Sequence, residues 1–264
     1  MNYKAINKKT WNEKTDVHIA SEFYNMTAFR AGHNTLKSIE LALLGDVKGK
    51  SILHLQCHFG QDTLSLARMG AEVTGIDLSD KAILRATELA KELDLPATFV
   101  CCDVYDTPKY VTQKFDIVFT TYGTIGWLPD LDKWASVVAQ SLKPGGRLVF
   151  AEFHPVVWMF DDDFKTVAYP YFNREPIVET TSGTYADRDA TIVDSTVSWN
   201  HHFGEVIQAL IDRGLQLTHF SEYDYSPHSC FKNIDEFEPG KFRIKGFKSR
   251  LPMVYALEAV KPAR

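Results

Sequence analysis

The sequence has no long run of one charge, no hydrophobic stretch of membrane length and few cysteines. Lys and Arg total 29 against 34 Asp and Glu, for a formal net charge of −5, and no cluster of cations could neutralise nucleic-acid phosphates. Residues 1–20 contain early lysines but lack the apolar core of a signal peptide, and no apolar run approaches the ~20 residues of a membrane span. We therefore expect a soluble cytoplasmic protein that binds neither nucleic acid nor membranes.

Cysteine usage agrees with a reduced, intracellular location. No C-x-x-C pair occurs among the four cysteines, which are Cys57, Cys101, Cys102 and Cys230. A metal site is not expected, because the adjacent His201 and His202 would diverge and no further ligand lies at helical or zinc-finger spacing.

One stretch, residues 51–79, has the pattern of a strand, a turn, a helix and a second strand. An apolar run at 52–55 has the length of a buried strand, and a helix-period segment at 63–69 stops at Gly70, the residue expected just past a helix end. The second apolar run ends in Asp77. Ligands bind at the carboxyl ends of parallel strands, and a carboxylate there can accept both hydroxyls of a ribose. The stretch therefore predicts a site for a nucleoside-containing cofactor.

Strands alternate with helices through most of the remaining chain. This alternation predicts an α/β fold with a doubly wound, mostly parallel sheet of seven strands. We expect further strands at 97–102, 115–120, 147–153, 215–223 and 253–260, helices at 33–44, 81–93 (with Ser79 as N-cap), 130–142 and 204–213, and an ordered loop at 227–250.

We expect a single domain made of four segments. Residues 154–202 are rich in aromatic side chains and hold two alternating runs, 177–185 and 191–199, which predict a β-hairpin lid too short for a core of its own. Residues 1–32 are polar with scattered rings, and form either a tail packed across the core or a flap over the cofactor. The segments are an N-terminal flap and preliminary helix (1–49), a cofactor-binding core (50–153), an inserted lid or substrate region (154–202) and the C-terminal part of the sheet (203–264).

Taken together, these motifs resemble the class I S-adenosylmethionine-dependent methyltransferases over roughly residues 50–262. In that family an acid-x-Gly-x-Gly-x-Gly loop follows the first strand, and ILHLQCHFGQDT here lies in register with the frequent form VLDLGCGTGRDT. Cys57, Gly60, Asp62 and Thr63 agree, whereas His54, Gln56 and His58 replace the acid and two glycines. The turn at 142–146 matches the one before the fifth strand. The resemblance implies a Rossmann-like fold, S-adenosylmethionine as cofactor, S-adenosylhomocysteine as product and a small-molecule methyl acceptor.

The resemblance also implies which residues hold the cofactor. Asp77 matches the acid that binds the ribose, and Asp103 matches the acid that meets the adenine amino group. Gln56 and His58 would fill the space of the glycines or donate hydrogen bonds to the methionine carboxylate. The full expected set is Gln56, Cys57, His58, Gly60, Gln61, Asp62, Thr63, Asp77, Leu78, Ser79, Cys102, Asp103, Val104, Thr121 and Tyr122.

Residues after the fourth and fifth strands face the acceptor in the family. Methyl transfer depends mainly on positioning, and an added general base is expected among His154, Tyr122 and Glu152. His154 is the best base by its ordinary pKa, although a loop histidine more often hydrogen-bonds a carbonyl. The signature Asn-Pro-Pro-Tyr is replaced by Thr121-Tyr122-Gly123-Thr124, which, with the acidic balance, disfavours a DNA methylase.

Two other functions fit part of the pattern. A nicotinamide oxidoreductase requires an intact G-x-G-x-x-G after the first strand, which is absent. A catalytically degenerate protein with the methyltransferase fold, acting as a nucleoside-binding or regulatory module, is favoured by the lost glycines. Asp77, Asp103 and the aromatic lid favour an active enzyme. We predict the enzyme, as a monomer or homodimer.

Overall fold

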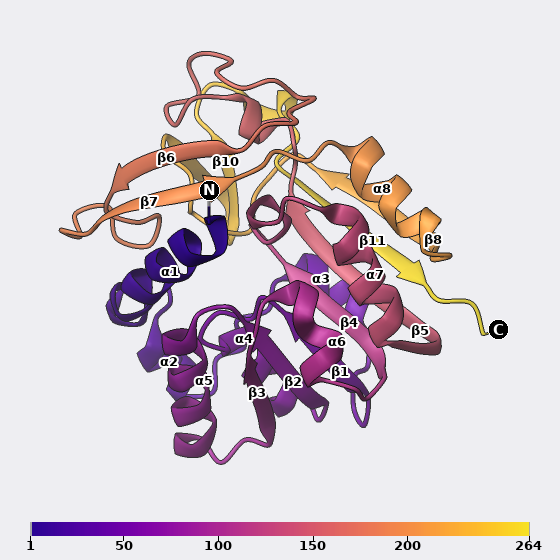
Figure 1. Cartoon of the computed structure of the whole chain (residues 1–264). Helices are drawn as coiled ribbons and strands as arrows, with labels where there is room; N and C mark the ends of the chain where they lie inside the picture. The colour runs from indigo at the N-terminus through magenta and orange to yellow at the C-terminus, as the bar shows by residue number, and fades with distance from the viewer. Residues whose placement is uncertain (1, 264) are drawn as a thin grey trace.

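Seven strands form the central sheet of the computed structural model, which describes residues 2–263 (Figure 1). Their order is β3-β2-β1-β4-β5-β11-β8; the first five pair in parallel, and β11 is antiparallel to both β5 and β8. This confirms the predicted doubly wound, mostly parallel sheet. The strands are β1 (Ser51–Leu55), β2 (Glu72–Asp77), β3 (Ala97–Cys101), β4 (Phe115–Thr121), β5 (Leu142–Phe153), β8 (Gln216–Tyr223) and β11 (Val254–Val260).

Helices cover both faces of the sheet, which is why its inner strands β1 and β4 read as nearly continuous apolar runs. Alternate side chains of one strand enter different cores: Leu53 and Leu55 pack with the helices of one face, whereas Ile52 packs with those of the other. The first face carries α7 (Leu131–Ser141) and α8 (Phe203–Asp212), and the second carries α3 (Ser38–Leu44) and α4 (Gln61–Arg68).

The helix after β2 begins where the sequence predicts. This helix, α5 (Asp80–Glu92), has Ser79 as its N-cap, and the Ser79 hydroxyl accepts the N–H of Ala82 at 3.0 Å. The helix predicted at 33–44 begins only at Ser38, where the Glu40 side chain accepts the backbone N–H of Lys37 at 2.6 Å and so caps the first turn. Two short helices, α2 (Met26–Arg30) and α6 (Thr107–Tyr110), complete the core.

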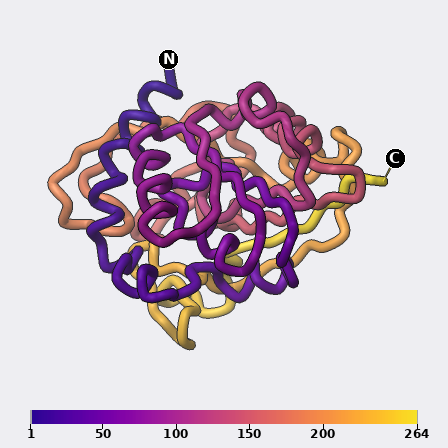
Figure 2. Tube along the Cα trace, turned by 90° about the horizontal axis from the view of Figure 1, so that it is seen from below, coloured from indigo at the N-terminus to yellow at the C-terminus, as the bar shows by residue number. Residues whose placement is uncertain are grey.

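The polar N-terminal segment contains a long helix, α1 (Tyr3–Ala20), that the sequence pattern did not predict. Its buried face is itself polar, consisting of Asn7, Thr10, Lys14, Thr15 and His18, so no apolar periodicity marks it. Figures 1 and 2 both show this indigo helix beside the orange segment that holds β7.

The predicted hairpin is present, and α1 is bonded to it. Strand β6 (Ile177–Ser182) pairs antiparallel with β7 (Val193–Ser198). The Asn7 amide donates to the carbonyl of Val197 at 2.8 Å and accepts its N–H at 2.9 Å, and Thr10 donates to the carbonyl of Ser195 at 2.7 Å. The side chains of α1 thus take the place of a further strand on β7.

A second hairpin lies in the stretch expected to be a loop. Strands β9 (Ile234–Glu238) and β10 (Lys241–Ile244) pair antiparallel. The expectation was wrong. Strand β9 is mostly exposed and three of its five residues are charged, and the alternation of β10 spans only four residues, too few to mark a strand. None of the helices among residues 2–263 is long and apolar enough to cross a membrane.

Replacing Asn7 with Ala tests whether α1 is held by its polar face. Asn7 is 3% exposed, so Asn7→Ala leaves the N–H and carbonyl of Val197 without partners, and we expect the free energy of unfolding to fall by about 2 kcal/mol or more. Urea denaturation measures the change. Lys9→Ala, on the exposed face of the same helix, is the control and should cost less than about 0.5 kcal/mol; equal losses in the two variants would contradict this account.

Candidate active site

A cavity of about 990 Å³ lies at the carboxyl ends of β1 to β4, beneath α1 and the β6–β7 hairpin. Most of the residues expected to bind a cofactor line it, although they come from four strands and the loops that follow them. Those that line it are Gln56, Cys57, His58, Gly60, Gln61, Asp62, Asp77, Leu78, Cys102, Asp103, Val104, Thr121 and Tyr122. Thr63, Ser79, Glu152 and His154 are not among its lining residues.

The loop after β1 has the backbone of a glycine loop although two of the glycines are replaced. Gln56, His58 and Gly60 all adopt left-handed conformations, with φ of 55°, 52° and 83°. This conformation costs a non-glycine residue about 1 kcal/mol or more, so the surrounding structure must impose it. The loop is closed by a hydrogen bond from the N–H of Gly60 to the carbonyl of Cys57 at 3.0 Å. The loop therefore holds left-handed backbone at two positions where the family form has glycine.

Gly60 cannot be replaced in the same way. A Cβ at this position would lie 2.8 Å from the ring of Phe99, so both the positive φ and the close packing require glycine.

His54 occupies the position of the family's loop acid and bonds within the core. Its Nδ1 lies 2.8 Å from the hydroxyl of Thr63, and both side chains are buried. Burial lowers the pKa of His54 to about 3, so the imidazole is neutral. This pair explains why Thr63 faces His54 instead of the cavity.

The two acids at the ends of β2 and β3 accept hydrogen bonds at the cavity wall. Asp77 receives the N–H groups of His58 and Ser79, each at 2.8 Å. Asp103 receives the N–H of Tyr105 at 2.8 Å and the ammonium of Lys4, from α1, at 2.8 Å. Burial raises the pKa of Asp77, while the hydrogen bonds to its carboxylate lower it. Each carboxylate has acceptor sites left over for a ligand.

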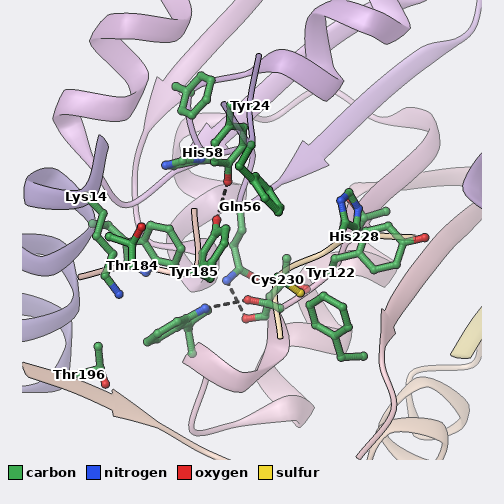
Figure 3. A pocket seen from close by; sticks show the side chains of 18 of the residues that line it. Lys14, Tyr24, Gln56, His58, Tyr122, Thr184, Tyr185, Thr196, His228 and Cys230 are labelled. Atoms are coloured by element: carbon green, nitrogen blue, oxygen red, sulfur yellow. Dashed lines mark hydrogen bonds between the residues drawn. The ribbon is translucent and has the colours of Figure 1, made fainter. Parts of the chain in front are cut away.

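Gln56 offers an unused hydrogen-bond acceptor to the cavity. Its Nε2 donates to the carbonyl of Thr124 at 2.9 Å, as the dashed line in Figure 3 shows. Because a carbonyl only accepts, this bond fixes the orientation of the amide, and the buried Oε1 is left without a partner among the described residues. His58 Nε2 is buried and unpartnered too. Buried polar atoms are rarely left unpaired, so both atoms indicate a ligand.

Tyr122 lines the cavity, but its hydroxyl is already engaged. It donates to Glu40 at 2.7 Å, and in Figure 3 it points away from Gln56 and Tyr185. Burial raises the pKa of Glu40 to about 7 and that of Tyr122 well above its ordinary value. The phenol is therefore a proton donor within a buried pair.

Glu152 organises the loop that follows β4. Its carboxylate accepts N–H groups from Gly123, Thr124 and Phe153, including one at 2.7 Å from Thr124, and a further bond from the Thr124 hydroxyl at 3.1 Å. Burial raises the pKa of Glu152 and these bonds lower it. All its partners are donors, so the ionised form fits the site. It shapes the cavity wall through the backbone without reaching the cavity itself.

His154 lies in a bonded environment of its own. Its Nε2 is 2.8 Å from Glu222, and its Nδ1 accepts the N–H of Val156 at 3.2 Å. Because Nδ1 accepts, Nε2 carries the proton and donates to the carboxylate. Burial lowers the pKa of His154. Neither ring nitrogen is free to take a proton from a molecule in the cavity.

Side chains of α1 form part of the cavity wall, which sequence reasoning missed. Trp11 packs edge-on against His58 at 5.3 Å and against Trp127 at 5.4 Å between ring centroids, and His18 lies 5.1 Å from His58. The sequence did contain a signal for this helix. Intervals of three or four residues, the spacing of one helix face, separate Tyr3, Asn7, Trp11, Lys14 and His18.

Within residues 2–263 no group of three His, Cys, Asp or Glu side chains could hold a metal ion.

The comparisons with known proteins agree with this geometry. Residues 52–146 match the family model described as "Methyltransferase domain". A curated relative, the ubiquinone biosynthesis O-methyltransferase of Coxiella burnetii, is 34% identical over 116 residues, which cover 44% of this chain and 48% of the relative. The chain thus spans about half the length of the curated relatives it matches first.

Solved structures share the fold over most of the chain. A SAM-dependent methyltransferase from Methanosarcina mazei aligns with a TM-score of 0.58 and 19% identity, covering 87% of this chain and 99% of that one. Magnesium protoporphyrin IX methyltransferase from Synechocystis, solved with bound S-adenosylhomocysteine, aligns with a TM-score of 0.57 and 15% identity over 98% of this chain and 100% of its own. The chain has the fold of the S-adenosylmethionine-dependent methyltransferases, and its residues 52–146 match the methyltransferase domain model.

Proposed function

We propose that this protein transfers a methyl group from S-adenosylmethionine to a small-molecule acceptor. The observation that carries the proposal is the left-handed path of residues 56–60, which keeps the shape of a glycine loop beside Asp77 and Asp103. A degenerate loop would have no reason to keep two non-glycine residues in a costly conformation. The curated relative that acts in ubiquinone biosynthesis as an O-methyltransferase supports the same reaction class.

The residues of the cavity fit the parts of this cofactor. Asp77 would accept the ribose hydroxyls, Asp103 the adenine amino group, and the unpaired Oε1 of Gln56 the ammonium of the methionine part. The cofactor supplies a methyl group on a sulfonium, which an acceptor atom attacks in line as the carbon–sulfur bond breaks. The chain contributes by holding both molecules in the cavity, and such positioning can account for most of the catalysis.

The proposal needs no general base among His154, Tyr122 and Glu152. His154 and Glu152 do not line the cavity, and the hydroxyl of Tyr122 donates to Glu40. We therefore propose a positioning role for Glu152, through the 123–125 loop, and none in proton transfer for His154.

A small acceptor and a cytoplasmic location complete the proposal. The cavity of about 990 Å³ has room for a cofactor and a compact second molecule. All four cysteines are free, as a reduced compartment requires.

Calorimetric titration with S-adenosylmethionine, S-adenosylhomocysteine and NAD, run in parallel, tests the proposed function. We expect the first two to bind and NAD not to bind. Binding of NAD, or of none of the three, would contradict the proposal.

Asp77→Ala tests the ribose contact. Loss of a charge-assisted contact to two hydroxyls should weaken binding of S-adenosylhomocysteine by about 1.5–3 kcal/mol, which calorimetry measures. Because Asp77 also accepts the N–H of His58, the unfolding free energy of the free variant is measured alongside. Asp132→Ala, which removes an exposed acid from α7, is the control for charge; affinity equal to that of wild type in Asp77→Ala would rule out the ribose assignment.

Gln56→Gly tests whether the amide is a ligand or only a spacer. Glycine relieves the strain of the positive φ but removes the Oε1 acceptor, and we expect about 10-fold weaker binding of S-adenosylhomocysteine. Methylthioadenosine, which lacks the amino-acid part, should bind both proteins equally. Tighter binding of S-adenosylhomocysteine to Gln56→Gly would show that the loop glycine is preferred and that Gln56 is no ligand.

A further inference from the structure

Lys14 is a buried cation that faces the cavity without an acceptor. Only 8% of the residue is exposed, and it lines the cavity from the inner face of α1. Its ammonium lies 5.6 Å from the centre of the Trp11 ring, and within residues 2–263 it takes part in no hydrogen bond or ion pair. Burying an ammonium without an acceptor is costly, so this arrangement calls for a negatively charged partner from outside the chain.

The other cations at the cavity do not share this situation. Arg188 donates to the carbonyl of Cys230 at 3.0 Å, and Lys232 pairs with Asp162 at 2.8 Å. Lys37 is less buried than Lys14.

Two threonine hydroxyls accompany Lys14. Thr184, which follows β6, accepts the N–H groups of Ala186 and Asp187 at 3.1 and 3.0 Å, so its own proton is available to donate. Thr196, on β7, is buried and makes no side-chain hydrogen bond within the described chain. Both line the cavity, and Figure 3 shows them on the same side of it as Lys14. One ammonium and two hydroxyl donors thus face the cavity together.

Asp194, whose charge acts on Lys14, is a weak counterion. Asp194 is buried, and its Oδ2 has no hydrogen-bond partner among the described residues. Burial and Glu13 raise the pKa of Asp194 to about 6. Its charge offsets part of the burial cost of Lys14, whose pKa is nonetheless lowered. The balance of charge between Lys14 and Asp194 therefore suits a ligand with one negative charge better than a doubly charged phosphate.

We infer that Lys14, with the hydroxyl groups of Thr184 and Thr196, binds a carboxylate group of the methyl acceptor. The inference rests on the proposed function and adds the chemical class of its substrate. Two of the three donors belong to residues 154–202, outside the matched methyltransferase domain, and none belongs to the loop after β1. The aromatic side chains that line the same cavity, among them Trp11 and Trp127, suit an acceptor with a flat apolar body.

The test uses the full chain saturated with S-adenosylhomocysteine. Benzoate and phenylacetate are titrated by calorimetry against their uncharged counterparts, benzamide and phenylacetamide. We expect at least one carboxylate to bind about 10-fold or more tightly than its amide, and Lys14→Met to abolish that preference. Lys9→Met, which removes an exposed lysine from the same helix, is the matched control and should keep it.

Thr196→Val provides a second variant of nearly unchanged shape, in case Lys14→Met fails to fold. We expect it to reduce the preference for the carboxylate by a smaller factor than Lys14→Met. Wild-type protein that binds neither carboxylate better than its amide, or variants at both positions that keep the preference, would overturn the inference.

The source of the carboxylate is settled by titrating the cofactor itself. If Lys14→Met weakens S-adenosylhomocysteine but leaves methylthioadenosine unchanged, the site holds the methionine carboxylate and the acceptor assignment is overturned. Failure of the proposed function has a separate signature, since wild-type protein would then not bind S-adenosylhomocysteine. The carboxylate series is in that case run on the free protein.

Discussion

The cavity depends on the hydrogen bond between the backbone N–H of His58 and the carboxylate of Asp77, which joins the ends of β1 and β2. With this bond the chain can turn through left-handed conformations at Gln56 and His58 without glycine. The energy for that strain comes from interactions outside the loop, including the bonds to Asp77 and the tether from Gln56 to Thr124. The acid proposed to hold the ribose therefore also shapes the surface on which the rest of the cofactor would lie.

The part of the fold held by apolar burial could be predicted from sequence. The unit from β1 to β2 is clear because Ile52, Leu53 and Leu55 form a short run that is buried on both faces of the sheet. Asp77 and Asp103 could be located in a similar way, since each stands at the end of an apolar run in the sequence. The sequence pattern predicts well where a strand ends, and therefore which residues follow it.

The part held by polar contacts could not be predicted in this way. Helix α1 buries Asn7, Thr10 and Lys14 in place of apolar side chains. A helix face of this kind cannot be detected from hydrophobic periodicity. Glu152 resembles a catalytic acid in sequence, yet its partners are backbone N–H groups of a loop nearly 30 positions away. Only the folded chain shows that His154 bonds to Glu222. These roles depend on which groups meet in space.

Helix α1 is attached differently from the sheet beneath it. Ion pairs join it to the core, from Lys4 to Asp103 and from Asp16 to Lys81, and amide hydrogen bonds join it to β7. Dissolved salt screens ion pairs that water can reach, whereas strongly hydrated anions such as sulfate reinforce the burial of apolar surface. Raising the concentration of such a salt therefore weakens the ion pairs that hold α1 over the cavity, while it strengthens the apolar packing of the sheet beneath.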